Sequence, residues 1–304
     1  MSDYDLLIAG EINPDLILTG DVTPAFGQAE KLVEDATLTV GSSSVIVACG
    51  AARLGLRVAF IGLCGDDLFG QFMLAEMQRR GVNTSHVIVR ENGRTGLSII
   101  LNRGDDRAIL TFPGLISALR AADIPDALLA RSRHLHIASY FLQTALQPDL
   151  PGLFQRAHTL GLTTSLDPNY DPSGRWEGFD QLLPHTDLFL PNQQEALALT
   201  QAPSVEDAAQ LLARRAGLVA VKLGAAGALA ARGETLVRAT SIPVQVADTV
   251  GAGDSFDAGF LFGYLQGWPL EKTLRLATVC GALSTRQPGG VAAQPTLEEA
   301  LVHL

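Results

Sequence analysis

The sequence is poor in lysine, cysteine and aromatic residues, and these shortages exclude several classes of protein. Lysine occurs only at positions 31, 222 and 272, and the net charge of −10 argues against a nucleic-acid-binding surface or attraction to anionic membranes. The three cysteines, at 49, 64 and 280, are odd in number and form no CxxC pair. They predict no disulfide framework and favour a reducing cytoplasm as the location.

Long apolar runs and several common nucleotide-binding signatures are also missing. No run is long enough to span a membrane, and the acidic start Met-Ser-Asp-Tyr-Asp is unlike a secretory signal. The chain has no G-x-x-x-x-G-K-[ST] loop, no HRD or DFG set, and no G-x-G-x-x-G after its first expected strand. These absences argue against P-loop enzymes, protein kinases and dinucleotide-binding dehydrogenases.

Short β-rich runs alternate with helical patterns along most of the chain. Strands are expected at 6–10, 58–63, 134–139, 163–167, 187–190 and 218–223. Helices are expected at 44–54, 67–80, 149–160, 192–199, 204–216, 254–266, 270–286 and 296–304. This rhythm predicts an α/β fold with a doubly wound, mostly parallel sheet flanked by helices, as a single domain over residues 1–304.

Two regions break this rhythm. Residues 12–40 and 95–112 carry β patterns, and the second contains the hairpin turn Asn-Arg-Gly-Asp-Asp at 102–106. We expect these two insertions to form a small separate sheet that acts as a lid over the site.

The most informative segment is Asp-Thr-Val-Gly-Ala-Gly-Asp at 248–254, which leads into an apolar helix. Glycines allow a tight turn at a helix start, where free N–H groups can hold an anion. Asp254 follows directly and could take a proton from a hydroxyl beside that anion. An anion cradle beside a carboxylate base is what phosphoryl transfer to an alcohol needs. The alternative is a glycine turn before an ordinary helix.

Taken with other segments in the same order, this motif resembles the ribokinase family, the PfkB carbohydrate kinases. The resemblance covers nearly the whole chain and rests on seven segments: Gly10-Glu-Ile-Asn13-Pro-Asp15, Gly41-Ser-Ser-Ser44 leading into Ala51-Ala-Arg-Leu-Gly55, Gly62 to Gly70, Asp167-Pro-Asn169, Asn192-Gln-Gln-Glu195, Lys222-Leu-Gly224-Ala-Ala-Gly227, and Asp248 to Asp254. The fold that it implies is a doubly wound α/β domain capped by a small β-sheet lid.

The resemblance implies a role for each segment. Asp254 would be the catalytic base, and the amides of Gly251, Ala252 and Gly253 would hold the charge on the transferred phosphoryl group. ATP would lie near Asn192, Lys222, Gly224, Gly227, Gly253 and Thr278. Glu195, Asn192 and Asp167 would organise Mg²⁺ mostly through water. Asp248, Val250, Ser284 and Gly289 match the place where many relatives bind K⁺.

Substrate contacts are implied for Asn13, Asp15, Gly41, Ser42 and Ser43, together with Asp254, and Gln143 is expected to reach the same pocket. One motif departs from the family, because sugar-binding relatives usually carry Gly-Gly and then an Asn four residues later. Here those positions are Ser42 and Ile46. The hydroxyl pattern of the substrate therefore cannot be copied from ribokinase.

Several residues have a second interpretation that the sequence leaves open. Asn192 and Glu195 also make a good helix start, and Asn13-Pro14-Asp15, Asp167-Pro-Asn169 and Lys222 to Gly227 are also turn signatures. Arg103 and Arg107 could reach the pocket from the lid hairpin, although solvation is the plainer role. His134 and His136 share one face of a strand, and without further ligands we expect core histidines.

The sequence thus predicts an ATP- and Mg²⁺-dependent kinase that phosphorylates a hydroxymethyl group of a small sugar or sugar acid. A nucleoside kinase of the same superfamily is the alternative, and a non-catalytic sugar-binding sensor is a third hypothesis. Aromatic residues make up only 6% of the chain, with Phe26 and Phe112 in the lid regions, which favours a sugar over a nucleoside. We expect a homodimer that pairs through the lid.

Overall fold

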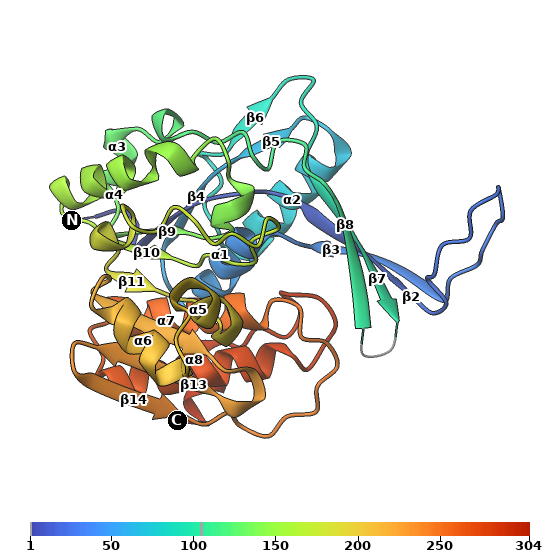
Figure 1. Ribbon diagram of the computed structural model, residues 1–304. Coiled ribbons are helices and arrows are strands. Elements are labelled where there is room, and N and C mark those ends of the chain that lie inside the picture. Colours follow the sequence, from blue (N-terminus) through green and yellow to red (C-terminus); the bar gives the residue numbers. More distant parts are fainter. Residues whose placement is uncertain (1, 104–105) are drawn as a thin grey trace.

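The computed structural model describes residues 2–103 and 106–304, and its centre is an eight-stranded sheet (Figure 1). The strand order is β14-β13-β12-β11-β10-β9-β1-β4. Six strands are parallel: β1 (Leu6–Ala9), β4 (Val58–Ile61), β9 (His134–Ile137), β10 (Thr163–Leu166), β11 (Leu188–Phe189) and β12 (Leu218–Lys222). At one edge, β13 (Ala228–Arg232) and β14 (Thr235–Ala239) are antiparallel. The predicted mostly parallel sheet is confirmed.

Helices cover both faces of this sheet, because alternate strand residues belong to two separate cores. Leu6 and Ile8 pack with residues of α1 (Ser43–Arg53), α2 (Leu68–Arg79), α7 (Ala252–Leu265) and α8 (Leu270–Ser284). Leu7 and Ala9 pack with residues of α3 (Asp126–Leu129), α4 (Leu150–Thr159), α5 (Gln193–Thr200) and α6 (Val205–Ala213). The short α9 (Leu297–Leu301) follows. Continuous apolar strands are what this two-sided burial requires.

Most predicted elements are present, and the differences have local causes. The expected helix at 296–304 is only Leu297–Leu301, and the expected strand at 187–190 is only Leu188–Phe189. The β13–β14 hairpin and the two-stranded sheet of β5 (Leu63–Gly65) and β6 (Ile88–Arg90) were not predicted. Alanine-rich β13 has little strand propensity, so its pairing with β12 decides its conformation. Short 3-10 turns occupy Ala121–Asp123, Tyr140–Leu142, Gln147–Asp149, Leu183–His185 and Gly224–Ala226.

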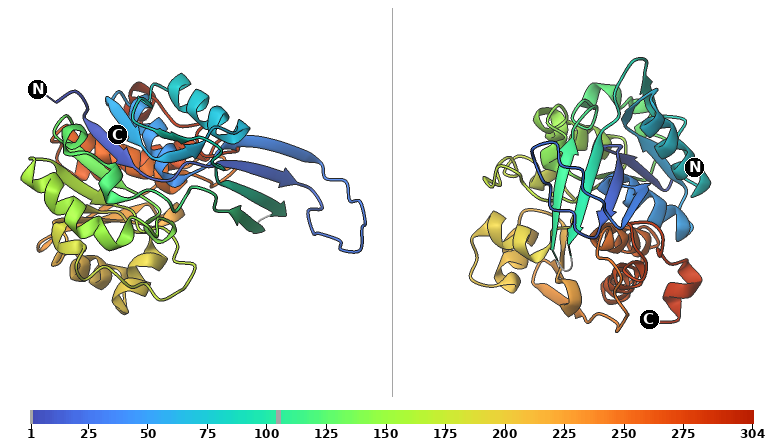
Figure 2. Two further views of the ribbon diagram at one scale, coloured as in Figure 1. Left: turned by 90° about the horizontal axis from the view of Figure 1, so that it is seen from above. Right: turned by 90° about the vertical axis from the view of Figure 1, so that its right-hand side faces the viewer.

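A second sheet of four strands projects from the body, as Figures 1 and 2 show. It consists of β2 (Pro14–Thr19), β3 (Asp35–Val40), β7 (Leu97–Arg103) and β8 (Asp106–Phe112), in the order β3-β2-β7-β8. We call it the projecting sheet. Its strands come from the two segments, 12–40 and 95–112, that were expected to form a small sheet. Gly104 and Asp105 of the predicted hairpin turn lie outside the described residues.

The two faces of the projecting sheet differ in burial. Asp15, Ser98 and Ile100 are neighbours on one face and are at most 9% exposed, so this inner face is turned toward the body. The opposite, outer face carries a set of apolar side chains that are half-buried or exposed: Leu16, Leu18, Leu38, Leu97, Ile99, Leu101, Leu110 and Phe112. The projecting sheet therefore turns one face toward the body and presents an apolar surface on the other.

Among the helices of the described residues, none has both the length and the apolar character needed to cross a membrane.

Candidate active site

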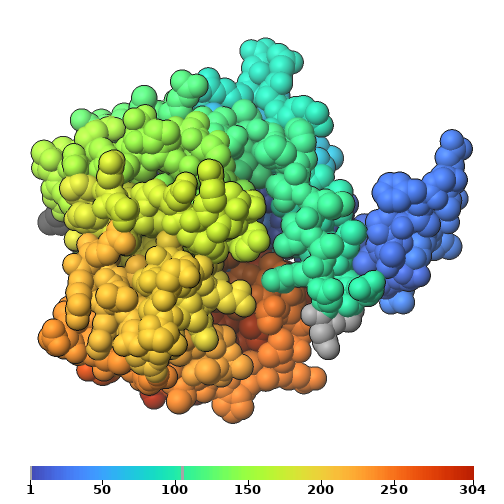
Figure 3. Space-filling model, viewed as in Figure 1, coloured from blue at the N-terminus to red at the C-terminus, as the bar shows by residue number. Residues whose placement is uncertain are grey.

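The polar residues singled out in the sequence gather at one edge of the large sheet. β1 has β4 on one side and β9 on the other, so the direction of winding changes there. Open α/β sheets bind ligands at this kind of switch point, outside the carboxyl ends of the strands. The starts of α1 and α7 lie at the same place, and the inner face of the projecting sheet lies opposite. Figure 3 shows the surface hollowed between that sheet and the body.

The Gly-Ala-Gly-Asp segment forms the start of α7, as predicted. Gly251 has a φ of 72° and lies so close to the backbone of Gly290 that a Cβ would meet the Gly290 Cα at 2.5 Å. Only glycine fits here. The first-turn N–H groups of an α-helix have no partner within the helix, so this end can receive an anion.

Asp254 lies in the first turn of α7 and is only 9% exposed. Burial raises the pKa of its carboxyl group to about 7, against the lowering effect of a hydrogen bond from Ser43. A carboxylate with such a pKa can take up a proton near neutral pH, which is the property of a general base. The structure therefore places a buried, titratable carboxyl group in the first turn of a helix whose free N–H groups could receive an anion.

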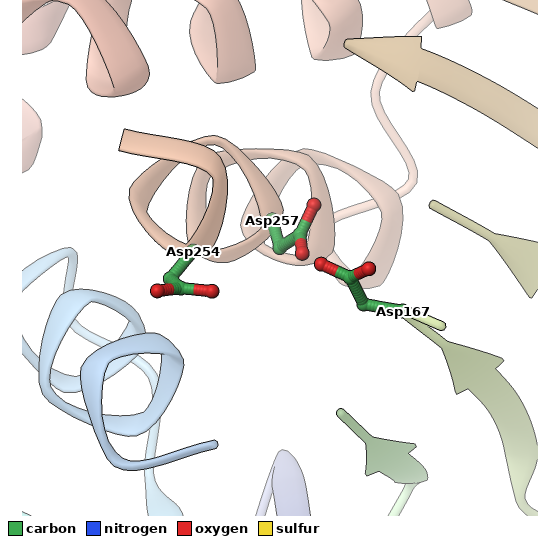
Figure 4. Close-up of side chains that lie close together, drawn as sticks. All are labelled: Asp167, Asp254 and Asp257. Carbon is green, nitrogen blue, oxygen red and sulfur yellow. The ribbon is translucent and has the colours of Figure 1, made fainter. Parts of the chain in front are cut away.

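A buried ion-pair cluster lies directly beneath this helix start (Figure 4). Asp167, at the end of β10, and Asp257, one turn after Asp254, both bind the Nζ of Lys222, at 2.6 Å and 3.1 Å. Burial alone would lower the pKa of Lys222, but the two carboxylates raise it. Burial raises the pKa of Asp257, whereas Lys222 overcomes burial and lowers that of Asp167. Lys222 is thus held as a cation under the anion site.

A cavity of about 620 Å³ opens at the α7 start, where Ala252 and Gly253 form part of its lining. Five of the residues predicted to lie near a nucleotide line it: Lys222, Gly224, Gly227, Gly253 and Thr278. Apolar side chains of Ile242, Pro243, Val244, Val246 and Phe256 complete much of the wall. The cavity has the size and the apolar lining of a small-molecule site.

Asn192 lies outside this cavity and forms a capping box with Glu195 at the start of α5. The Asn192 Oδ1 accepts from the Glu195 N–H at 2.9 Å, and a Glu195 oxygen accepts from the Asn192 N–H at 2.8 Å. The two residues therefore do start the helix as a capping box, and their predicted roles toward ATP and Mg²⁺ stay predictions. Burial raises the pKa of Glu195 to about 7, and the charge of Asp167 adds to the effect.

On the other side of Asp254, the end of β1 and the start of the projecting sheet form a buried polar pocket wall. The Asn13 Nδ2 lies 3.4 Å from both Asp15 Oδ1 and Ser98 Oγ. Gly41 packs against this pair, since a Cβ there would meet Asp15 Oδ1 at 2.2 Å. Burial raises the pKa of Asp15 to about 7, although the charge of Arg107 opposes it. The structure brings Asn13, Asp15 and Gly41 together as predicted.

The three serines at the start of α1, Ser42, Ser43 and Ser44, make different hydrogen bonds. Ser42 caps α1, accepting from the Val45 N–H at 3.1 Å, and donates to the Glu11 backbone oxygen at 2.7 Å. Ser44 donates to the Glu11 carboxylate at 2.6 Å. Ser43 alone reaches Asp254, donating to its Oδ1. Ile46, where relatives usually carry Asn, is 3% exposed and belongs to the core.

Two other candidates for the substrate pocket make contacts away from Asp254. Gln143 is 1% exposed, and its Nε2 donates to the Ala138 backbone oxygen at 2.5 Å. Arg103 is exposed and lies 3.4 Å from the Thr23 hydroxyl. Contact of Gln143 with a substrate stays a prediction. Arg107, on the same sheet, affects Asp15 through its charge, which lowers the pKa of that carboxyl group.

The loop before α7 is tied to the loop after α8 by Asp248. Its carboxylate accepts from the backbone N–H groups of Val250 and Gly289, both at 3.0 Å. Ser284 donates to the Gly281 backbone oxygen at 2.9 Å. Asp248, Val250 and Gly289 are thus brought together, and the K⁺ site predicted from them stays a prediction.

The two strand histidines are core residues, as expected. His134 and His136 are fully buried, and both bond to Ser165 Oγ, at 2.6 Å and 2.7 Å. Burial lowers the pKa of both imidazoles, to about 4 in His136. They are neutral at physiological pH and belong to the interior of the sheet.

Sequence reasoning missed Glu11, Asp257 and Ser139 as site residues. Glu11 accepts from three serines of two segments, including Ser139 Oγ at 3.0 Å. A charged residue directly after a buried strand, and a second Asp three positions after Asp254 in an apolar helix, were signals for two of them. Ser139 offered no signal, because its contact with Glu11 depends on the pairing of β9 with β1.

Comparisons with known proteins agree with this geometry. The family model described as pfkB family carbohydrate kinase matches residues 5–297. An uncharacterized sugar kinase from Archaeoglobus fulgidus is 36% identical over 236 residues, which cover 77% of this chain and 93% of that protein. A 2-dehydro-3-deoxygluconokinase from Bacillus subtilis is 31% identical over 271 residues, covering 83% and 82%.

Solved structures show the same architecture. A putative ribokinase II from E. coli, in complex with ATP and Mg²⁺, is 22% identical with a TM-score of 0.88, and the match covers 98% of each chain. Adenosine kinase from Sinorhizobium meliloti is 28% identical with a TM-score of 0.86, covering 99% of this chain and 98% of that one. The fold is therefore ribokinase-like, and the chain belongs to the pfkB family of carbohydrate kinases.

Proposed function

We propose that this kinase transfers the γ-phosphoryl group of ATP to a hydroxyl, most simply a hydroxymethyl group, of a small sugar or sugar acid. One observation carries the proposal: Asp254 lies at a helix start between two compartments. Its neighbour Gly253 lines the cavity of Lys222, Gly224 and Thr278, and its partner Ser43 lies two residues after Gly41, which packs against Asp15. The first would hold ATP and the second the acceptor.

The proposed reaction moves one proton and one phosphoryl group. The acceptor O–H gives its proton to the Asp254 carboxylate while its oxygen attacks the γ-phosphorus, and ADP leaves. The amides at Gly251, Ala252 and Gly253 would stabilise the charge on the transferred group, helped by the helix dipole. A base with a pKa near 7 combines sufficient ionisation with sufficient basicity at neutral pH.

The residues beneath the helix start fit a requirement for Mg²⁺. Asp167, Asp254 and Asp257 each place a carboxylate oxygen within 4.8 Å of the others, and hard oxygen ligands are what Mg²⁺ prefers. Asp167, with Glu195 and Asn192 nearby, would hold the hydrated ion, which would neutralise the phosphate charge. Lys222 already binds two of these carboxylates. The loop around Asp248 is where we place K⁺, if the enzyme uses it.

The nature of the acceptor follows from the pocket wall. Asn13 and Asp15 offer one amide and one carboxyl group to vicinal hydroxyls, and Gly41 allows Asp15 to lie against the backbone there. Ile46 lies in the core, so a polar contact that many sugar-binding relatives have is absent. The relative named for a sugar acid supports including acids among the candidates.

A nucleoside acceptor is the second candidate, and one observation favours it. Tyr170 follows Asn169 directly, is 73% exposed, and is an edge-on neighbour of Trp176 with ring centres 6.3 Å apart. The exposed ring of Tyr170, held against the half-buried Trp176, could stack on a base. The likeness to an adenosine kinase points the same way.

We also propose that two copies pair through the outer face of the projecting sheet, in a reducing cytoplasm. Leu110 and Phe112 of that face are 58% and 39% exposed, and β3 and β8 are edge strands. The segment between β2 and β3 adds Phe26 and Leu32, 97% and 85% exposed. Contiguous apolar surface of this kind marks interaction sites. The three described cysteines are free and buried, which suits a reducing compartment.

The test is ADP release with ATP and Mg²⁺ over a panel of neutral sugars, sugar acids and nucleosides. Release that depends on one acceptor class, with a phosphorylated product of matching mass, would support the proposal. Release with nucleosides alone would establish the second candidate. A lack of acceptor-dependent release across the panel, while sugars still bind, would favour a non-catalytic sensor.

A further inference from the structure

A closed ring of hydrogen bonds joins four segments of the chain beside the start of α7. Its members follow three strands or begin a helix: Glu11 after β1, Ser139 after β9, Asn169 after β10, and Ser43 with Ser44 at the start of α1. Glu11 makes the first half of the ring. Its carboxylate accepts from Ser44 Oγ at 2.6 Å, from the Ser44 N–H at 3.1 Å and from Ser139 Oγ at 3.0 Å.

Asn169 makes the second half of the ring. Its Oδ1 accepts from the backbone N–H of Ser139 at 2.6 Å, and because a backbone N–H can only donate, this contact fixes which end of the amide is the oxygen. Its Nδ2 donates to Ser43 Oγ at 3.2 Å. Asn169 therefore spans the same two segments that Glu11 joins. Ser43 also makes a hydrogen bond to Asp254, so the ring ends at that carboxyl group.

The carboxylate of Glu11 supplies what the start of α1 lacks. This helix has no acidic residue in its own first turn, and the first-turn N–H groups of a helix have no partner within it. Glu11 accepts from one of them, that of Ser44, where the helix dipole favours a negative charge. Ser42 depends less on the carboxylate, because its hydroxyl lies closer to the Glu11 backbone oxygen, at 2.7 Å, than to Oε1, at 3.0 Å.

The ring has a buried side and an open side. Glu11, Ser44 and Ser139 are at most 5% exposed, whereas Ser43 and Asn169 are partly exposed. Ser139 and Asn169 also have positive φ values, 52° and 53°. Left-handed backbone at non-glycine residues is costly and persists where the surroundings enforce it. The buried bonds to Glu11 thus hold the two half-exposed polar side chains next to Asp254.

We propose that Glu11 is a positioning residue that holds Ser43 and Asn169 in place beside Asp254 and so sets how an acceptor alcohol meets that carboxyl group. The ring itself can be tested without a substrate, and only its effect on the reaction rests on the proposed function. Among the described residues that line the cavity proposed for ATP, none belongs to this ring. Glu11 should therefore affect the use of the acceptor and not that of ATP.

Two substitutions of Glu11 separate its hydrogen bonds from its charge. In Glu11→Gln the amide oxygen can take the place of Oε1, which accepts from the Ser44 N–H and from Ser139 Oγ. The amide nitrogen then takes the place of Oε2 and donates to Ser44 Oγ, since a hydroxyl can also accept. One bond reverses its direction and the ring stays closed. Glu11→Ala removes all of these bonds and opens the ring.

The first test is structural and needs no substrate. Crystal structures of the wild type and both variants, grown in one crystal form, give the distance from Asn169 Nδ2 to Ser43 Oγ. It should remain a hydrogen bond, within about 3.5 Å, in Glu11→Gln and be lost in Glu11→Ala. An intact bond in Glu11→Ala, or its loss in both variants, would overturn the inference. Thermal unfolding shows that each variant is folded.

The second test uses the sugar, sugar acid or nucleoside that gives the most ADP release with the wild type. Glu11→Ala should lower kcat/KM for it by about 10- to 100-fold, because small displacements beside the reacting groups are costly, and should leave the KM for ATP within about twofold. Glu11→Gln should recover most of the loss. Leu153→Ala, in the buried face of α4, is the control for lost stability alone. It should unfold at a lower temperature and keep the KM values for acceptor and ATP.

A double-mutant cycle tests the connection between Glu11 and Ser139. Ser139→Ala removes one bond of the ring without removing a charge, so it should lower the same kcat/KM by a smaller factor. Adding it to Glu11→Ala should cause no further loss, because the hydroxyl acts through Glu11. Additive losses, or an equal rise in the KM for ATP, would refute the proposal. Failure of the proposed function would appear separately, as a wild type without acceptor-dependent turnover, and the structural test would still decide the role of Glu11.

Discussion

Three carboxyl groups of the site, those of Asp15, Glu195 and Asp254, have pKa values raised to about 7, chiefly because burial removes water from the ionised form. Each is at most 9% exposed. Groups of this kind bind protons more tightly in the folded than in the unfolded state. The free energy of unfolding should therefore fall as pH rises toward 7, which is the range in which the enzyme would work.

Asp15→Asn tests this link. The unfolded pKa is near 3.8 and the folded value about 7, so the folded state binds the extra proton and wild-type stability falls as pH rises between these values. The variant should unfold at a higher temperature than the wild type at pH 8, by an amount worth at most about 4 kcal/mol, and the difference should vanish below pH 4. Thermal unfolding from pH 4 to 8 measures it.

The control is Asp35→Asn, which changes an exposed aspartate of the same sheet and should show no such gain. In kinetics, Asp15→Asn should lower kcat/KM for the acceptor roughly tenfold or more, because a hydrogen bond to a charged group is lost, and should leave the KM for ATP nearly unchanged. A rise in the KM for ATP at constant acceptor affinity would reverse the assignment of the two compartments.

The sequence was sufficient to identify residues whose position follows from a motif. Asp254 lies in the first turn of α7, and Asn13 and Asp15 lie where the chain passes from β1 into β2, as the order of segments predicted. Glu11 and Ser139 could not be found in this way. Their contacts depend on which strands become neighbours, and the sequence does not state that β9 lies beside β1.

At the scale of elements, the buried cluster of Asp167, Lys222 and Asp257 joins β10, β12 and α7. Lys222 Nζ lies within 3.1 Å of carboxylate oxygens of both partners. The positive charge of Lys222 offsets the cost of burying two carboxyl groups. The same contacts hold the start of α7 against the sheet. Removing it would leave charges without a partner, which costs more than the pair itself contributes.

Lys222→Met should therefore lower the free energy of unfolding at pH 8 by about 3–5 kcal/mol. The loss should shrink as pH falls toward 5, because the stranded carboxyl groups take up protons. Urea unfolding at both pH values measures the effect. Lys272→Met is the matched control, since Lys272 is exposed and its contact is the ring of Trp268, and it should cost about 1 kcal/mol or less. Equal losses in the two variants would contradict this account.

Helices and strands with a clear apolar pattern in the sequence were predicted within a few residues. Elements whose pattern is weak were not predicted. The strands buried on both faces and the long helices α1, α2 and α8 have continuous or periodic apolar patterns. The β13–β14 hairpin has an alanine-rich first strand and an exposed second one, so its pattern gives no β signal, and pairing with β12 decides its structure. The Asn192–Glu195 box shows a further limit, since one motif can cap a helix and serve a ligand.

At the scale of the whole molecule, the projecting sheet has an inner face toward the body and an apolar outer face, through which we propose that two copies pair. Leu110 and Ile109 are adjacent on β8 and similarly exposed, 58% and 54%, but they point to opposite faces. Pairing through the outer face therefore predicts different effects for substitutions at these two residues. Leu110→Glu should convert a dimer to a monomer, because a charge would be buried in the apolar interface.

Light scattering coupled to size-exclusion chromatography gives the mass directly. Ile109→Glu is the matched control and should leave the dimer intact. A wild-type protein that is monomeric at micromolar concentration, or a dimer that Ile109→Glu disrupts and Leu110→Glu does not, would refute pairing through this face.

The central claim is that Asp254 is the base for phosphoryl transfer to an alcohol, and Asp254→Asn tests it most directly. The side chain keeps its size and loses its basicity. With the best acceptor from the panel, kcat should fall by about 10²–10⁴-fold, while calorimetry shows ATP and acceptor still binding. A kcat within a few-fold of the wild type, with a phosphorylated product of the same mass, would contradict the claim.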